Sequence, residues 1–220
     1  MLMMGRALAM QPDNFQKRQS CPNVHVFGAR ETTAPAGMGS AGAMVNMILQ
    51  AHPGATSEAI DYPAQGDSNY GSSVQAGTRA VGQQVNSFAQ RCPDTQIVIV
   101  GYSQGAQITN NANCGGGDPN QGYTETEPLV IGTVQDQVKA IILMGDPRFT
   151  PGESFNVGSA TAGGFSAREP GFVCPVADKI QSYCDSPDPY CSNGNNAQTH
   201  QSYVSVYGQQ ALEFVNSKLS

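Results

Sequence analysis

Several features are missing from this sequence, and each absence excludes a class of protein. The 220 residues contain no run of 18 apolar residues, so the sequence predicts no transmembrane helix and no membrane partner. Charged residues make up only 13%, and the net charge is −6, so the chain lacks the basic surface that nucleic acids require. A polar surface with few charges is better suited to an uncharged polymer or a small ester.

Motifs for metals and cofactors are also missing. No C-x-x-C occurs, and no histidine stands at a zinc-ligand spacing from a cysteine, so we expect no metal. The glycine-rich segment 113–128 lacks the G-K-[ST] of a phosphate-binding loop. We therefore interpret it as a wall or rim of a site, and we expect no cofactor.

The cysteines indicate the compartment. An even number at wide spacing is typical of three disulfides and an extracytoplasmic protein, whereas six reduced, buried thiols in a cytosolic enzyme are the alternative. The sequence alone allows fifteen pairings. The six are Cys21, Cys92, Cys114, Cys174, Cys184 and Cys191.

The first twenty residues are set apart from the predicted domain. Their apolar run is short and broken by Arg6, which makes a poor signal peptide. Lys17 and Arg18 precede Gln19 and resemble a dibasic processing site. We expect residues 1–20 to be a pro-segment or an ordinary tail, and residues 21–220 to be a single domain.

Hydrophobic periodicity predicts alternating strands and helices, with two strands that are apolar throughout. That pattern is typical of an α/β protein with a mostly parallel five-stranded sheet, buried by helices on both faces as a three-layer sandwich. Functional sites in such sheets form at the carboxyl ends of the strands. The expected strands are 24–27, 58–63, 96–100, 139–147 and 179–184, and the expected helices are 38–51, 72–90, 103–113 and 203–219.

A candidate nucleophile follows one of the apolar strands. In IVIVGYSQGAQI, a strand runs into Gly-x-Ser-x-Gly and then into a helical segment, which is the pattern of a nucleophile elbow centred on Ser103. The flanking Gly101 and Gly105 suit a turn where strand and helix pass close together. A serine that merely caps the helix is the alternative.

A serine nucleophile needs a base, and the chain offers three histidines. His25 lies inside the first strand and is expected to pack in the core, and His52 lies at a helix end. His200 is the only histidine after Ser103, which matches the order serine, acid, histidine of α/β-hydrolases.

The acid must lie between these two residues. Asp188 stands between Cys184 and Cys191, where a disulfide would make the loop rigid. Asp146, at the end of a strand, and Asp185 remain alternatives.

Six motifs in order resemble those of the cutinase and acetylxylan esterase family of secreted fungal serine esterases (carbohydrate esterase family 5), most closely its acetylxylan esterases. The likeness extends from Cys21 to the C-terminus. It implies a small, lidless α/β-hydrolase with Ser103, His200 and Asp188 as its catalytic triad. It also implies an oxyanion hole from Gln104 and Thr32. The motifs are CPNVHVFGARETT, VGYSQGAQI, CGGGDPNQGYT, KAIILMGDP, YCDSPDPYC and NAQTHQSY.

The resemblance also implies a disulfide pattern, namely Cys21–Cys92, Cys114–Cys174 and Cys184–Cys191. Many acetylxylan esterases have further cysteines where this chain has Ser159 and Ser192, so one bridge of those relatives is expected to be missing.

The expected function is a secreted, monomeric serine esterase that removes acetyl groups from acetylated xylan. The polar rim segments favour short acyl groups, and Tyr190 is expected to narrow the acyl side of the site. Cutinase-like hydrolysis of longer esters is the alternative. A non-catalytic polysaccharide-binding protein on the same fold is a further one.

Overall fold

The computed structural model describes residues 21–220. The proposed pro-segment or tail, residues 1–20, lies outside the described residues.

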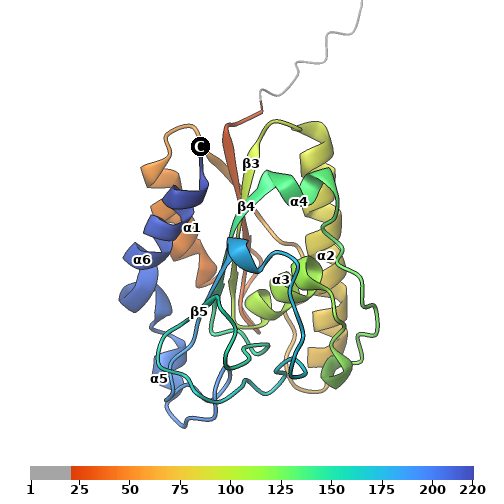
Figure 1. Cartoon of the computed structure of the whole chain (residues 1–220), viewed down its shortest axis with the longest axis vertical. Coiled ribbons are helices and arrows are strands. Elements are labelled where there is room, and N and C mark those ends of the chain that lie inside the picture. Colours follow the sequence, from red (N-terminus) through yellow and green to blue (C-terminus); the bar gives the residue numbers. More distant parts are fainter. Residues whose placement is uncertain (1–20) are drawn as a thin grey trace, which may run out of the picture.

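One parallel sheet organises the described part of the chain (Figure 1). Its strand order is β2-β1-β3-β4-β6-β5, and all neighbouring strands are parallel. The first strands in the sequence therefore lie on one side of β3 and the later strands on the other. The six strands are β1 (Val24–Ala29), β2 (Thr56–Ala59), β3 (Gln96–Tyr102), β4 (Val138–Met144), β5 (Asn156–Val157) and β6 (Ile180–Tyr183).

Helices cover both faces of this sheet, which confirms the three-layer α/β fold. Figure 1 shows α1 (Ala41–Ala51) and α6 (Tyr203–Lys218) on one side, and α2 (Tyr70–Arg91), α3 (Gln104–Cys114) and α4 (Thr133–Gln137) on the other. The remaining short helices are α5 (Ala197–His200) and the 3-10 turns η1 (Asp67–Asn69), η2 (Pro119–Gln121) and η3 (Ala177–Lys179).

The core consists of two layers because the side chains of each strand alternate between the faces. In β3, Ile97 and Ile99 pack towards α2 and α3, whereas Val98 and Val100 pack towards α1 and α6. All four side chains are fully buried. An apolar run without polar alternation is therefore what a central strand of this sheet requires.

Three strand predictions need correction. The strand expected at 139–147 ends at Met144, because Gly145 has φ 64° and turns the chain out of the strand. The strand expected at 58–63 lies at Thr56–Ala59, since the carbonyls of Ile60 and Tyr62 accept hydrogen bonds from the Arg30 guanidinium instead of a neighbouring strand. The sheet also has a sixth strand, β5, at its edge. Its two residues pair with Ser182 and Tyr183 and are too few to produce a periodic pattern.

Three disulfides occur in the described part, and their pairs are those that the family resemblance implies: Cys21–Cys92, Cys114–Cys174 and Cys184–Cys191. At Ser159, one of the two positions where the resemblance implies a missing cysteine, the hydroxyl donates to the Asp185 carboxylate at 2.8 Å. None of the helices described is both long and apolar enough to span a membrane.

His25 packs in the core as expected. Its ring stacks on Phe88 with 3.9 Å between ring centroids, and its Nδ1 lies 2.7 Å from the Thr56 hydroxyl. Burial lowers the pKa of His25 from 6.5 to about 4; nearby Glu58 opposes this shift, and Arg91 adds to it. The folded protein therefore holds this imidazole neutral at a pH where the unfolded chain protonates it.

We predict that His25→Phe flattens the dependence of stability on pH. Because the folded pKa lies below the unfolded value, His25 contributes stability above pH 6.5 that is lost as the pH falls towards 4. The wild-type free energy of unfolding should fall by up to about 3 kcal/mol more than that of the variant over this range. Urea unfolding at several pH values measures the difference, and equal slopes would contradict it.

Candidate active site

Ser103 lies at the junction of β3 and α3, at the carboxyl end of the sheet. Its backbone has φ 54° and ψ −121°, a conformation that non-glycine residues rarely adopt. The Ser103 N–H donates to the Met144 carbonyl at 2.8 Å, which ties the turn to β4. A strained serine after a strand and before a helix is the geometry of a nucleophile elbow.

The two glycines around Ser103 make this turn possible. A Cβ atom at Gly101 would lie 2.5 Å from the Gly105 carbonyl oxygen, and one at Gly105 would lie 2.1 Å from the Ala29 carbonyl oxygen. Both distances are far inside van der Waals contact. Gly101 therefore lets α3 fold back on β3, and Gly105 lets α3 approach the end of β1.

His200 reaches the same cleft as Ser103 from the last residue of α5. Its backbone carbonyl accepts a hydrogen bond from the Tyr102 hydroxyl at 2.6 Å. Its ring lies so close to Gly145 that a Cβ there would be 2.6 Å from Cε1 and 2.8 Å from Nδ1. Residue 145 must therefore be glycine for the imidazole to occupy this position.

The Asp188 carboxylate is fully buried and holds the His200 ring. Its Oδ2 accepts from His200 Nδ1 at 2.7 Å and from the Tyr203 hydroxyl at 2.7 Å. Its Oδ1 accepts from the backbone N–H groups of Tyr190, at 2.7 Å, and Cys191, at 3.1 Å. Burial would raise the pKa of Asp188, but the hydrogen bonds from His200, Tyr190 and Tyr203 hold this pKa below its ordinary value.

The other candidate acids are engaged elsewhere. Asp146 is also fully buried, and burial raises its pKa to about 6, but its two oxygens accept from Asn110 Nδ2 and the Arg148 N–H. Asp185 accepts from Ser159 and from the Tyr207 hydroxyl. Of the three candidates, Asp188 is the one whose carboxylate bonds to His200.

The two residues expected in the oxyanion hole flank Ser103 from different elements. Gln104 is the first residue of α3, whose N-terminal N–H groups have no carbonyl one turn back to bond. Its side chain is fixed by bonds to the Ser73 hydroxyl and the Gln65 carbonyl, each 2.9 Å. Thr32 lines the cleft beside Ser103, in the loop after β1 that Arg30 ties to the chain after β2.

The cleft that contains Ser103 and His200 has a volume of about 860 Å³. Its lining includes Thr32 and Tyr190, and the Tyr190 ring packs against His200 with 4.5 Å between centroids. Tyr190 therefore lines the cleft next to the candidate base.

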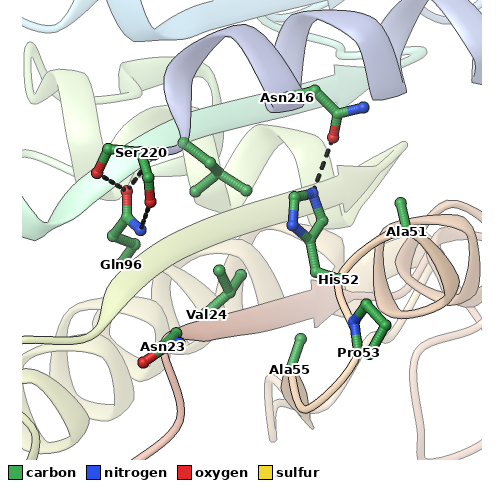
Figure 2. Close-up of a pocket in the computed structure, with 10 residues that line it drawn as sticks. Asn23, Val24, Ala51, His52, Pro53, Ala55, Gln96, Asn216 and Ser220 are labelled. Carbon is green, nitrogen blue, oxygen red and sulfur yellow. Dashed lines mark hydrogen bonds between the residues drawn. The ribbon is translucent and has the colours of Figure 1, made fainter.

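A second hollow, of about 330 Å³, lies at the opposite end of the sheet beside the first residues of β1 and β3 (Figure 2). Its polar side chains already bond one another: His52 Nε2 lies 2.8 Å from Asn216 Oδ1, and the Ser220 hydroxyl donates to Gln96 Oε1 at 3.0 Å. No Asp or Glu side chain lines this hollow, so none is placed there to orient its histidine.

The loop 113–128 contributes none of the residues that line the cleft, so its interpretation as a wall or rim needs correction. The loop is held to the chain after β4 by a buried ion pair. Arg148 lies 3.0 Å from Asp118, and the two side chains are 3% and 0% exposed. The Asp118 carboxylate also accepts from Gln107, Asn111 and Ser166. Through Gln107, which bonds to Tyr70, and Ser166, which follows Phe165, this loop supports two residues that do line the cleft. Within residues 21–220, no group of three or more His, Cys, Asp or Glu is placed to hold a metal ion.

Comparisons with known proteins identify the family of this chain. The sequence model of the cutinase family matches residues 20–219. The chain belongs to the cutinase family. Its relatives include Cutinase 11 of Verticillium dahliae, 60% identical over 93% of this chain and 71% of that protein. Acetylxylan esterase 2 of Talaromyces purpureogenus is 55% identical over 97% and 94% of the two chains. The solved catalytic core of an acetyl xylan esterase from Trichoderma reesei has a TM-score of 0.89 at 55% identity, covering 91% and 100%.

Several residues that shape this cutinase-family site were missed from the sequence. Tyr203 begins an amphipathic helix, and nothing in its pattern indicates a hydrogen bond to Asp188. Gly145 falls within the predicted strand 139–147, and nothing in the sequence indicates that its missing Cβ is what admits His200. Asp118 and Arg148 are 30 residues apart, so their pairing leaves no local signal.

We predict that Arg148→Met lowers the free energy of unfolding by about 3–5 kcal/mol, because it leaves the Asp118 charge buried without its partner. Urea unfolding measures this loss. The double variant Arg148→Met/Asp118→Asn should lose less than the sum of the two single variants.

The matched control is Arg79→Met, which breaks a pair of similar length with Glu125. Both side chains of that pair are 47% exposed, so this variant should change stability far less. Equal losses from the two substitutions would contradict the importance of the buried pair.

Proposed function

We propose that the protein is a secreted serine esterase that removes acetyl groups from acetylated xylan through an acyl-enzyme intermediate. Its class, carboxylic ester hydrolase, follows from membership of the cutinase family. The observation that carries the mechanism is the hydrogen bond from His200 to the buried Asp188, beside the strained Ser103 in one cleft.

In the proposed first step, His200 takes the proton from the Ser103 hydroxyl as the oxygen attacks the acetyl carbonyl. Because His200 Nδ1 is bonded to Asp188, Nε2 is the nitrogen left to accept this proton. Asp188 stays ionised and offsets the charge of the imidazolium that forms. The sugar hydroxyl then leaves, and a water activated by His200 releases acetate.

The oxyanion of each tetrahedral intermediate is assigned to donors on Gln104 and Thr32. Gln104 supplies a backbone N–H at the start of α3, where the helix dipole also favours negative charge. The Thr32 donors are its backbone N–H and its hydroxyl. One such donor is typically worth about 10²–10³ in rate.

Two observations support acetylated xylan as the substrate. Two relatives at 55–57% identity are named acetylxylan esterases. The cleft lining also includes carboxylates and hydroxyls, such as Glu31, Ser40 and Asp67, which suit sugar hydroxyls better than a long acyl chain. The three disulfides support secretion, because such bonds persist in oxidising compartments.

The direct test measures acetate released from acetylated xylan. The wild-type protein should release acetate, and Ser103→Ala should reduce kcat by about 10⁶, because the three triad residues act as a unit. Ser205→Ala, which removes an exposed hydroxyl on α6, is the matched control and should retain full activity. Near wild-type turnover by Ser103→Ala would end the proposal.

Hydrolysis of longer esters is the second candidate, because the 60%-identical relative is named a cutinase. Acetate and decanoate esters of 4-nitrophenol compared side by side decide between the two. We expect the acetate to react faster, and faster decanoate hydrolysis would reverse the choice of substrate.

A further inference from the structure

A row of aromatic side chains runs along the cleft from the candidate catalytic residues outward. Tyr190 packs against His200, and the Phe165 N–H donates to the Tyr190 carbonyl at 3.2 Å. The Phe165 ring in turn contacts the Tyr70 ring, with 5.6 Å between centroids and an angle of 65°. All three aromatic residues line the same cleft as Ser103.

Two rings of this row are unusually open to solvent. Phe165 is 49% exposed and Tyr190 is 43% exposed, although most aromatic side chains of this fold are buried. Exposed aromatic surface in a cleft is typical of a ligand-binding site. The cleft is also far larger than a single acetyl group needs, so it has room for more of the substrate.

Hydrogen bonds to buried side chains hold the Tyr70 and Phe165 end of this row in place. The Tyr70 hydroxyl donates to Gln107 Oε1 at 2.5 Å, and Gln107 Nε2 donates to Asp118 at 2.7 Å. Ser166, which follows Phe165, donates to the same carboxylate at 2.9 Å. Both ends of the Tyr70–Phe165 pair are therefore anchored to one buried group, and little conformational freedom remains to be lost on binding.

The other groups of the cleft indicate what this surface binds. Glu31 and Asp67 place carboxylates in the lining, and Gln201 adds an amide. A long acyl chain in this cleft would desolvate these polar groups without offering them hydrogen bonds. A pyranose ring has an apolar C–H face for an aromatic ring and hydroxyls at its edge for the polar groups. A cleft that combines aromatic rings with polar groups fits the sugar.

We propose that Tyr70, Phe165 and Tyr190 form a subsite for the xylan backbone. This subsite holds an unreacting pyranose ring next to the acetylated one. The inference rests on the proposed esterase function. It adds a binding surface that would make the enzyme prefer acetylated xylan over a small acetate ester. It assigns Phe165 to specificity: this residue contacts the bound sugar and not the reacting atoms.

The test compares two substrates of the same enzyme, an acetylated xylotetraose and 4-nitrophenyl acetate. For Phe165→Ala, the ratio of kcat/KM on the tetraose to kcat/KM on 4-nitrophenyl acetate should fall about tenfold, mostly through KM. Phe165→Tyr keeps a ring face and should retain the wild-type ratio. Phe165→Leu keeps apolar bulk without a ring face, and should lower the ratio. Val173→Ala is the control, since Val173 is 79% exposed and is not among the cleft residues.

An unchanged ratio in both Phe165→Ala and Phe165→Leu would overturn the subsite. A fall in the decanoate-to-acetate ratio of Phe165→Ala, with the tetraose ratio unchanged, would overturn it too and assign the row to an acyl chain. These outcomes are distinct from failure of the proposed function, in which Ser103→Ala would still hydrolyse 4-nitrophenyl acetate.

Discussion

A strand that runs directly into a helix leaves almost no space at the junction, and this chain meets that constraint with Gly101 and Gly105. Their missing Cβ atoms let α3 fold back on β3 and approach the end of β1. As a result Ser103 takes a strained backbone conformation, and its side chain reaches the cleft at the carboxyl end of the sheet. The other candidate catalytic residues can act only if they lie close to this serine.

Buried carboxylates hold segments that are distant in the sequence in position around that serine by hydrogen bonds. Asp188 lies in a short disulfide loop and accepts four hydrogen bonds, one of them from His200. Asp118 in turn bonds to Arg148, Gln107, Asn111 and Ser166. Gln107 and Ser166 support Tyr70 and Phe165, which line the cleft. Each carboxylate is buried and fully bonded, so neither loop can shift without leaving a charge unpaired. That arrangement keeps the cleft preorganised for its ligand.

The central fold could be predicted from the sequence because β3 and β4 are apolar except near their first residues, Gln96 and Lys139, and only a strand covered on both faces needs that pattern. The edge of the sheet could not, since β5 has two residues and β2 is partly exposed. Within the site, Gly-x-Ser-x-Gly identified Ser103 by a local constraint, whereas spacing left Asp146 open beside Asp188. Tyr203 and Gly145 depend on contacts between distant segments, which a single sequence does not encode locally.

The central claim is that Ser103 is activated by His200 and Asp188, and a serine-directed organophosphate tests it most directly. After incubation, peptide mapping by mass spectrometry should place one adduct on Ser103. Labelling should be much slower in His200→Ala, because the base that removes the serine proton is then missing. An unlabelled Ser103 in the folded wild-type protein, or equal labelling rates in the two proteins, would contradict the account.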